Sequence, residues 1–367
     1  MADTKQSGSM TLDPKYDHYD YPTTAPVARS GHPGHLTEAQ QAQVHQLRLM
    51  LESEGYTKRL DTLTLLRFLR ARKFDVNLSK KMFVDCEKWR ETILYVGQPL
   101  KIDGRSIHLD KEVSQWDKDG SFKKKVSKWY PQYYHKTDKD GRPVYIEQLG
   151  KIDIPAMKQE GIEYEHMLTN LAVEYEKMAD PRLPACSRKA GQLLETSCTI
   201  MDFNGVGFGN ARQVFGYIQE ASGMSQNYYP ERLGRMYLIN TSWLFTGVWR
   251  MVRPLLDPVT VEKIHVLGGN YQKELLSQIP AENLPKEFGG TCECEGGCHL
   301  SNSGPWCEPE FYRPAWWEKE EGADAPAAGA TIENKPTEVG GAAAAGGEAE
   351  KPLVEGEEAK APAPAAA

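Results

Sequence analysis

The spacing of apolar residues changes its period about one third of the way along the chain, and this change constrains the fold more than any other feature. Up to about residue 95 the apolar residues recur at helical spacing, whereas from about residue 130 short strand-like segments alternate with helical ones. Strands that alternate with helices favour a mostly parallel sheet covered by helices. The sequence therefore predicts an α/β protein with an α-helical N-terminal lobe.

Local signals place the elements of the helical lobe. Thr37 and Gln40 form a capping-box pattern that begins a helix ending near Glu54, and Asp61 can cap the helix TLTLLRFLRARKF. A third helix is expected from about Leu78 to Thr92. The residues before this lobe, 1–35, are rich in Pro, Gly, His and Tyr without periodicity and are expected to form an irregular arm.

The second lobe is expected over residues 96–310. Residues 92–128 are interpreted as a polar connection, and HKTDKDGRPVYIEQLG as two strands joined by a tight turn at 139–141. Further strands are expected within ETSCTIMDF, at 236–240 and at the end of VEKIHVLG. The helices expected between them are 164–178, 210–224 and 246–254. Residues 318–367 are of low complexity and are expected to be disordered, because they cannot bury enough apolar area to offset the entropy of ordering.

Charge and cysteine content exclude several classes of protein. From Glu318 onward there are eleven acidic residues and four lysines, which accounts for the net charge of −7, so the rest of the chain is neutral. A neutral body argues against a nucleic-acid binder. Seven cysteines in a long chain favour reduced thiols in the cytosol, and the polar N-terminus predicts no secretory signal.

Catalytic signatures are not found, so an enzyme is not expected. The turn Gly205-Val206-Gly207-Phe208-Gly209 is similar to a dinucleotide-binding loop, but its third glycine comes one residue early and the next strand ends in Asn240. We interpret it as a glycine-rich strand-to-helix turn. The two DKDG segments lack a complete set of calcium ligands and are interpreted as turns.

A cysteine-rich segment near the end of the second lobe lacks the spacing of a common metal site. Cys292, Cys294, Cys298, His299 and Cys307 lack the paired CxxC spacing of common zinc sites. We therefore expect solvent-exposed reduced thiols and no metal ligands.

Seven ordered segments carry a more specific resemblance, listed here as they stand: LLRFLRARKFD (65–75), YPQYYHKTDKDGRPVYIE (130–147), RLPACSR (182–188), ETSCTIMD (195–202), SQNYYPERLG (225–234), LDPVTVEKI (256–264) and IPAENLPKEFGG (279–290). Together they resemble the CRAL-TRIO lipid-binding family, in particular its fungal phosphatidylinositol/phosphatidylcholine transfer proteins. The resemblance implies a sheet that floors a large apolar lipid pocket, closed by a mobile helical gate.

The resemblance also implies binding residues. Those for the phosphatidylinositol headgroup are Arg72, Lys73, Glu231, Thr260 and Lys263. Those for the phosphatidylcholine headgroup are Tyr134, Tyr145, Tyr175, Ser197, Thr199, Met201 and Ser225. The gate corresponds to about 245–261, with Trp249, Val252 and Leu255 facing lipid or membrane.

These residue types suit the ligands. Arg and Lys supply charge-assisted donors to a buried phosphodiester, and aromatic rings attract the quaternary ammonium of choline. Ser197 and Thr199 alternate along a strand, so their hydroxyls are expected on one face. Taken singly, each group has an ordinary alternative: a solvated basic helix face, core tyrosines, or hydroxyls bonded within the sheet.

The implied function is non-covalent exchange of one phospholipid between membranes, or presentation of phosphatidylinositol to lipid kinases, in support of Golgi secretory traffic. Expected partners are the two lipids, bound one at a time as cargo, and, transiently, Golgi and endosomal membrane surfaces. No cofactor is expected. The protein is expected to be cytoplasmic, to be a monomer and to bind no nucleic acid. The alternatives are a carrier of another hydrophobic ligand such as a sterol or fatty acid, an NAD(P)-dependent enzyme, and a scaffold that uses lipid as a sensor.

Overall fold

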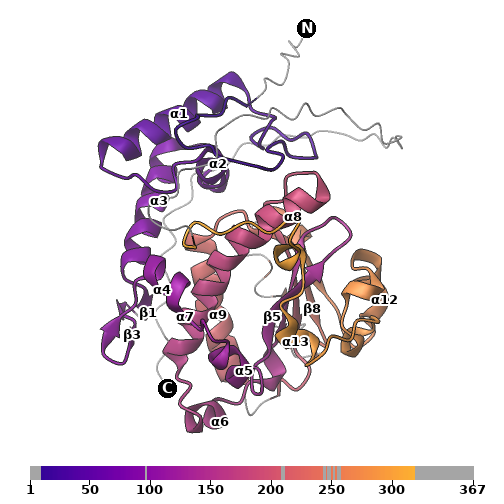
Figure 1. Ribbon diagram of the computed structural model, residues 1–367. Helices are drawn as coiled ribbons and strands as arrows, with labels where there is room; N and C mark the ends of the chain where they lie inside the picture. The colour runs from indigo at the N-terminus through magenta and orange to yellow at the C-terminus, as the bar shows by residue number, and fades with distance from the viewer. Residues whose placement is uncertain are drawn as a thin grey trace. The chain divides into compact units, whose positions relative to one another are not determined.

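The computed structural model describes residues 10–95, 97–207, 211–242, 245, 249–250, 253 and 258–318 (Figure 1). The helices are α1 (Glu38–Ser53), α2 (Thr62–Ala71), α3 (Val76–Glu91), α4 (Leu109–Gln115), α5 (Ser121–Val126), α6 (Ile154–Gln159), α7 (Tyr164–Lys177), α8 (Leu183–Ala190), α9 (Ala211–Tyr228), α11 (Pro258–Glu262), α12 (Gln272–Gln278) and α13 (Cys298–Ser301). The strands are β1 (Leu94–Tyr95), β2 (Gln98–Pro99), β3 (Lys101–Ile102), β4 (Arg105–Ser106), β5 (Gln132–Thr137), β6 (Pro143–Gln148), β7 (Ser197–Asp202), β8 (Leu233–Ile239) and β9 (Ile264–Val266).

The first two N-terminal helices begin at the residues that their caps predict, whereas α3 begins at Val76, two residues before the expected Leu78, with Asp75 as its cap. Thr37 and Gln40 form both hydrogen bonds of the capping box before α1, and the Asp61 carboxylate accepts from the Thr64 amide at the start of α2. The leucines of α2 are buried against α1 and α3 in one apolar core, listed by its central members Leu47, Leu51, Leu65, Leu66, Leu69 and Phe83. The prediction of a helical N-terminal region is confirmed.

The segment 92–128 is not the simple polar connection that we expected. It forms two short hairpins, β1–β2 and β3–β4, followed by α4 and α5. The few apolar side chains in this segment are spread among many polar ones, which is why we expected a polar connection. Three of them, Ile93, Ile107 and Leu109, are nevertheless fully buried in the main core. They pack on residues distant in sequence, which local periodicity does not reveal.

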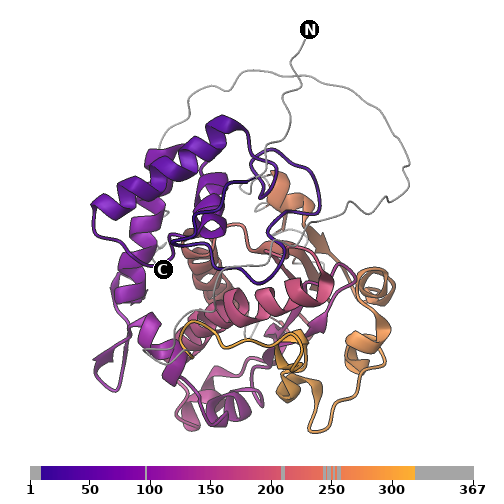
Figure 2. The same ribbon diagram turned by 45° about the horizontal axis from the view of Figure 1, so that its top comes forward.

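One five-stranded sheet forms the centre of the α/β region (Figures 1 and 2), with strand order β5-β6-β7-β8-β9. β5 and β6 form the predicted antiparallel hairpin, and β6, β7, β8 and β9 run parallel to one another. The mostly parallel sheet predicted from the alternation of strands and helices is confirmed.

The two faces of this sheet are covered by different elements. One face, the inner face, carries Met201, Met236 and Leu238 and packs against α7 and α9. The other, the outer face, carries Val144, Ile200 and Tyr237 and packs against α12 and α13. Alternate residues of a strand point to opposite faces, so the near-continuous burial along β6 and β7 reflects packing on both sides of the sheet.

The glycine-rich turn after β7 packs closely on another part of the backbone. A Cβ on Gly205, whose φ is +97°, would lie 2.8 Å from the carbonyl oxygen of Gly150. A Cβ on Gly150 would lie 1.8 Å from the carbonyl oxygen of Asn204. Both glycines are therefore required by this backbone contact, which explains the turn without a nucleotide.

The described part of the N-terminal arm, residues 10–35, consists of turns and bends and is attached to the helical region. The Asp17 carboxylate accepts hydrogen bonds from the amide and the hydroxyl of Thr62, both at 2.6 Å. The helix expected at 246–254 lies largely outside the described residues, and the tail expected to be disordered lies outside them from residue 319 onward.

α3 joins the helical region to α7 and α9. Trp89 stacks on Tyr228 with ring centroids 4.2 Å apart. Next to it, the Arg90 guanidinium donates to both carboxylate oxygens of Glu176, at 2.7 and 2.8 Å. This buried pair ties the N-terminal helices to the wall of the inner face.

Candidate functional site

The inner face of the sheet places several predicted site residues side by side. In the strand register, Tyr134 lies opposite Tyr145, Tyr145 beside Thr199, Thr199 beside Met236, and Met236 beside Ile264. Ser197 and Met201 lie two positions to either side of Thr199 on β7 and share its face. The face is fully buried at Tyr134 and becomes half-buried at Met236 and Ile264.

The three predicted choline-binding tyrosines belong to one cluster. The rings of Tyr134 and Tyr145 are 4.8 Å apart, and Tyr175 of α7 packs against the same group. Tyr175 stacks on Tyr229 and hydrogen-bonds with Ser225 of α9, while burial raises the pKa of its hydroxyl to about 12. The structure thus brings together all five of Tyr134, Tyr145, Tyr175, Thr199 and Ser225 around one wall of the inner face.

A buried carboxyl group lies at the base of this cluster. Glu147 of β6 is fully enclosed and accepts a hydrogen bond from the Tyr130 hydroxyl. Burial favours the neutral acid and, despite the hydrogen bonds from Tyr130 and Tyr145, raises the pKa of Glu147 to about 7. Sequence reasoning missed Glu147, although it stands two residues from Tyr145 on the same face.

A polar donor on the same face has no partner. The Oε1 atom of Gln132 accepts from the Tyr145 hydroxyl at 3.1 Å, but its Nε2 atom is buried and makes no hydrogen bond to the described residues. Buried amide donors are rarely left unpaired in proteins. This donor can serve a phosphate or ester oxygen on the inner face.

Arg182 is a second residue that the sequence did not single out, although it lies in a segment that carried the resemblance. Its guanidinium lies 4.4 Å from the ring centre of Tyr134 and 5.7 Å from that of Trp306. It also forms an ion pair with Glu174 at 3.0 Å. One face of Tyr134 is therefore already in contact with a cation. The sequence feature that could have indicated Arg182 is its position between Pro181 and Pro184 at the start of α8.

The predicted phosphatidylinositol residues form two groups. Arg72 and Lys73 follow α2, where Arg72 borders a hollow of about 250 Å³ together with Tyr228. Glu231, with a φ of +59°, points toward the same helix, its Oε2 atom 3.9 Å from the Nε atom of Arg70. Arg72, Lys73 and Glu231 therefore share the region around the end of α2.

Thr260 and Lys263 lie on the other side of β8. The Lys263 amide donates to the Thr260 carbonyl at 3.1 Å, and the Lys263 carbonyl accepts from the Met236 amide at 2.8 Å. No hydrogen bond or ion pair between the described residues joins this group to Arg72 or Lys73. Within the same described ranges, the charges of Arg72, Lys73 and Lys263 are not paired with a carboxylate, which leaves them free for an anionic ligand.

A larger pocket lies beside the last strand. Its volume is about 540 Å³ and it is lined by Thr241, Ser242, Trp249, Arg253, Val261, Ile264, Val266 and Gly268. Ile264 and Val266 belong to the inner face, so the predicted gate residue Trp249 lies over the half-buried end of that face. The other predicted gate residues, Val252 and Leu255, lie outside the described residues.

The cysteine-rich segment corrects one expectation. Cys292 and Cys298 are buried, with Cys294 half-buried and Cys307 exposed. The expectation of solvent-exposed thiols was wrong for the first two because the segment folds back onto β5, a contact that its glycine content did not reveal.

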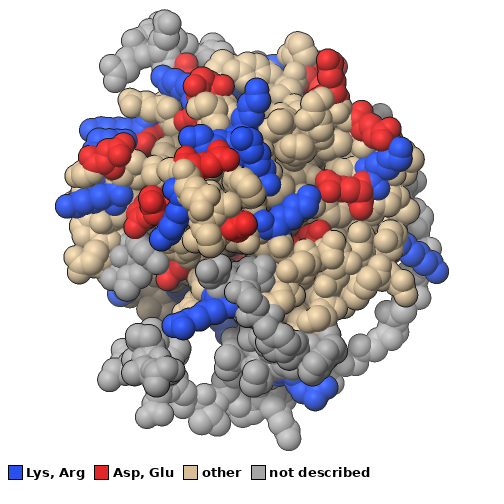
Figure 3. Space-filling view, turned by 90° about the horizontal axis from the view of Figure 1, so that it is seen from below, with Lys and Arg blue, Asp and Glu red and all other residues tan. Residues whose placement is uncertain are grey.

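The surface carries charges of both signs, in keeping with the equal numbers of basic and acidic residues before Glu318. Figure 3 shows basic and acidic side chains interspersed over one face of the molecule. No helix among the described residues combines the length and apolar character needed to span a bilayer.

Comparison with known proteins identifies the family. Residues 128–290 match the CRAL/TRIO domain, and residues 40–85 match the CRAL/TRIO N-terminal domain. The chain belongs to the CRAL-TRIO family, as its motifs indicated.

Three relatives are similar over most of the chain. The Sec14 cytosolic factor of Schizosaccharomyces pombe is 52% identical over 291 residues, which cover 79% of this chain and 96% of that protein. The SEC14 cytosolic factor of Kluyveromyces lactis is 51% identical over 298 residues, covering 80% and 93%. The phosphatidylinositol/phosphatidylcholine transfer protein SFH7 of Arabidopsis thaliana is 39% identical over 277 residues, covering 73% and 46%.

Proposed function

We propose that this protein is a non-catalytic carrier that binds one phosphatidylinositol or phosphatidylcholine molecule on the inner face of its sheet and exchanges it between membranes. The observation that carries the proposal is the cluster of Tyr134, Tyr145 and Tyr175 beside Thr199, at the buried end of an apolar face. Relatives that share about half of its sequence, and a plant relative whose name specifies both lipids, support it.

Such a carrier works by lowering a desolvation barrier. A diacyl phospholipid that leaves a bilayer exposes about 30 methylenes to water, at about 0.8 kcal/mol each, or roughly 25 kcal/mol in total. An apolar face formed by Met201, Met236, Leu238 and Ile264 can replace this water contact as the chains enter. No covalent step is needed, and no cofactor is proposed for the exchange.

The tyrosine cluster is suited to choline. A quaternary ammonium donates no hydrogen bond, so the ring faces of Tyr134, Tyr145 and Tyr175 that are not already covered by Arg182 or Tyr229 stabilise it by cation–π attraction. The Thr199 hydroxyl and the Nε2 atom of Gln132 are available as donors to the neighbouring phosphate, and the Ser197 hydroxyl, which donates to the Arg232 carbonyl at 3.5 Å, can be redirected to it.

Basic residues that form no ion pair with a described carboxylate are suited to phosphoinositol. Lys263 and Thr260 beside β8, and Arg72 and Lys73 at the end of α2, offer donors to phosphate, and Glu231 can accept from inositol hydroxyls. We propose that the two headgroups use different residues while their acyl chains share the inner face.

Membrane contact is proposed through the segment around Trp249. Trp249 is half-buried over the pocket, and Arg250 and Arg253 beside it are exposed. An amphipathic aromatic flanked by arginines favours the interface of an anionic membrane. In this proposal the protein acts as a monomer in the cytoplasm, touches Golgi and endosomal membranes transiently, and transfers phosphatidylinositol or presents it to lipid kinases.

Two double variants should separate the headgroups. In Ser197→Ile/Thr199→Ile, the loss of two hydroxyls and the added bulk should weaken phosphatidylcholine binding at least about tenfold, equivalent to about 1.4 kcal/mol, and spare phosphatidylinositol. Lys73→Ala/Lys263→Ala should weaken phosphatidylinositol binding by a similar factor and spare phosphatidylcholine. Native mass spectrometry with lipid extraction, on protein purified from a eukaryotic host, measures both.

Matched controls make that result specific. Lys101→Ala/Lys111→Ala removes the same two positive charges as Lys73→Ala/Lys263→Ala, but at exposed positions outside the proposed site. This control variant should bind both lipids normally. Thr199→Val removes a hydroxyl without added bulk and should reduce phosphatidylcholine binding partially. A sterol or fatty acid in the wild-type protein, or equal loss of both lipids in both double variants, would contradict the proposal.

The membrane contact is tested separately. In Arg250→Gln/Arg253→Gln, about 1 kcal/mol of attraction per charge is lost, so binding to vesicles that contain phosphatidylserine should weaken about 30-fold. Binding to neutral vesicles should stay unchanged, as should binding of Lys101→Gln/Lys111→Gln to either kind. A vesicle flotation assay at fixed ionic strength measures this, and equal binding by both double variants would exclude the arginines as the contact.

A further inference from the structure

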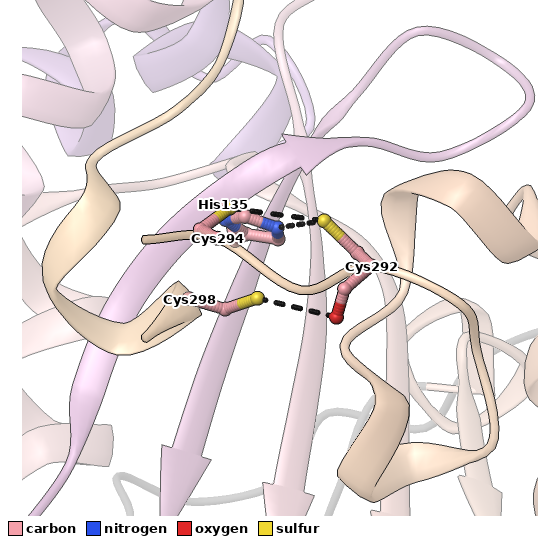
Figure 4. Close-up of side chains that lie close together, drawn as sticks. All are labelled: His135, Cys292, Cys294 and Cys298. Atoms are coloured by element: carbon pink, nitrogen blue, oxygen red, sulfur yellow. Dashed lines mark hydrogen bonds between the residues drawn. The ribbon is translucent and has the colours of Figure 1, made fainter. Parts of the chain in front are cut away.

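The folded chain brings one histidine to three cysteines that are more than 150 residues away. His135 comes from β5, whereas Cys292, Cys294 and Cys298 come from the turn before α13 and from its first residue (Figure 4). One side-chain ligand atom from each of the four lies within 4.8 Å of the other three. We propose that these residues bind a structural Zn²⁺ ion, independently of the proposed lipid-transfer function.

The distances fit a tetrahedral zinc site. With Zn–S bonds of about 2.3 Å and a Zn–N bond of about 2.0 Å, a tetrahedron has S···S edges of about 3.8 Å and S···N edges of about 3.5 Å. In the structure the Sγ atoms of Cys292 and Cys294 are 3.8 Å apart. The Nε2 atom of His135 lies 3.3 Å from the Sγ atom of Cys292. A Cys₃His set of this size is one of the common structural zinc sites.

A second layer of contacts orients the histidine. The Nδ1 atom of His135 is 3.2 Å from the Oγ atom of Ser301, whose hydroxyl in turn donates to the Cys298 carbonyl at 2.9 Å. Nδ1–H therefore donates to Ser301, which leaves the lone pair of Nε2 directed at the cysteines. Zinc-binding histidines are held in this way by a partner on the other ring nitrogen.

Local backbone geometry explains why His135 reaches the site. The pairing of β5 with β6 is irregular between Tyr134 and Thr137, and Lys136 has a φ of +48°. The Lys136 amide pairs instead with the Ser303 carbonyl at 2.7 Å. A bulge of this kind redirects side chains at the edge of a sheet, and here it joins β5 to the cysteine-rich segment.

The charge of the site is also balanced. Three thiolates and one neutral imidazole around Zn²⁺ carry a net charge of −1, and binding releases three thiol protons to solvent. The Nζ atom of Lys136 lies 3.1 Å from the Sγ atom of Cys292 and can donate to that thiolate. Cys292, Cys298 and His135 are buried, and buried thiolates need this compensation.

The set differs from the cysteine-rich cluster that the sequence displays. His299 packs edge-to-face against Tyr133 at 6.3 Å, and the exposed Cys307 donates to the Asn302 carbonyl at 3.1 Å. Neither joins the four ligands, and His135 supplies the fourth. The unpaired CxC and CxxxC spacing therefore did not argue against a metal site.

Zinc at this position would fix the segment after residue 291 to the edge of the sheet. That segment carries Trp306, which packs edge-to-face on Tyr134 and lies near Arg182. The ion thus acts as a cross-link between β5 and the chain that closes one side of the tyrosine cluster.

Metal analysis of the untagged, reduced, full-length protein tests the proposal. Inductively coupled plasma mass spectrometry after gel filtration should find about one zinc per wild-type chain. Cys294→Ser should lose at least about 80% of it and His135→Gln most of it, because a missing ligand weakens the site. Cys307→Ser is the matched control and should retain the wild-type content.

A second measurement decides the case in which the ligand variants fail to fold. Wild-type protein prepared with Co²⁺ in place of zinc, without oxygen, should show the intense visible bands of tetrahedral cobalt with thiolate ligands. Removal of metal by a strong chelator should expose the segment after residue 291 to limited proteolysis. Wild-type protein that neither contains zinc nor takes it up on dialysis, or equal zinc in wild type and Cys294→Ser, would overturn the proposal.

Discussion

Arg90→Met is expected to lower the free energy of unfolding by about 3–5 kcal/mol, a large loss for a single substitution in this protein. Arg90 donates to Glu176 at 2.7 Å and to Asp110 at 2.7 Å, and it is almost completely buried. The Tyr229 hydroxyl also donates to Glu176 at 2.6 Å. The variant leaves the Glu176 carboxylate buried without its counter-ion, and most of the loss arises there.

The charge states of the pair support this size of effect. Burial opposes the charge on Arg90, but the nearby Glu176 carboxylate more than compensates and holds the pKa of Arg90 well above its ordinary value. Burial would also raise the pKa of Glu176, yet Arg90 and Tyr229 hold it below its ordinary value. Each partner is therefore charged because the other is present.

Urea denaturation followed by circular dichroism measures the change, and two variants serve as controls. Lys58→Met removes an exposed partner of Asp110, at 3.3 Å, and should cost less than about 1 kcal/mol. Arg90→Met/Glu176→Gln removes both charges and keeps an acceptor for Tyr229, so it should recover much of the loss. A double variant that is as unstable as the sum of its single variants would show that the pair contributes nothing.

Glu147→Gln is expected to remove a pH dependence of about 3 kcal/mol from the stability of the protein. Burial raises the pKa of Glu147 to about 7 in the folded state, from an ordinary value of 4.5. Between these two pH values the folded state binds more protons at this residue than the unfolded state. The contribution of Glu147 is therefore full below pH 4.5 and is lost as the pH rises through 7, by about 3 kcal/mol.

The measurement compares the free energy of unfolding at pH 5 and at pH 7.5. The stability of Glu147→Gln relative to wild type should be about 2 kcal/mol greater at pH 7.5 than at pH 5, because part of the total loss has already occurred at pH 5. Glu310→Gln, at an exposed position, should show the same difference from wild type at both. If Glu147→Gln also differs equally from wild type at both pH values, the carboxyl is ionised at both and the pKa of Glu147 is not raised.

The same group bears on the proposed site. Glu147 lies beside Met201 in the strand register and accepts from Tyr130 under the tyrosine cluster. Its neutral form adds no charge to a face that must accept acyl chains. The residue joins the site through its tertiary position, since the family resemblance assigned it no role.

The sequence by itself determined most of the helices and strands and named the candidate site residues. The caps at Thr37 and Asp61, the hairpin of β5 and β6 and the alternation of Ser197 with Thr199 depend on residues a few positions apart, whose hydrogen bonds and side-chain directions are local. The motif resemblance identified the family, which the comparisons confirmed. The roles of the individual headgroup residues remain predictions, although the structure places several of them on one face.

Only the tertiary structure decided the contacts between distant parts of the chain. His135 meets Cys292 across a separation of 157 residues, and Arg90 meets Glu176 across 86. The fold of the segment 92–128 depends in the same way on the core that buries Ile107. Such contacts form where packing of the whole chain brings surfaces together, and burial, which sets the pKa of Glu147 and the environment of the thiols, is a property of that packing.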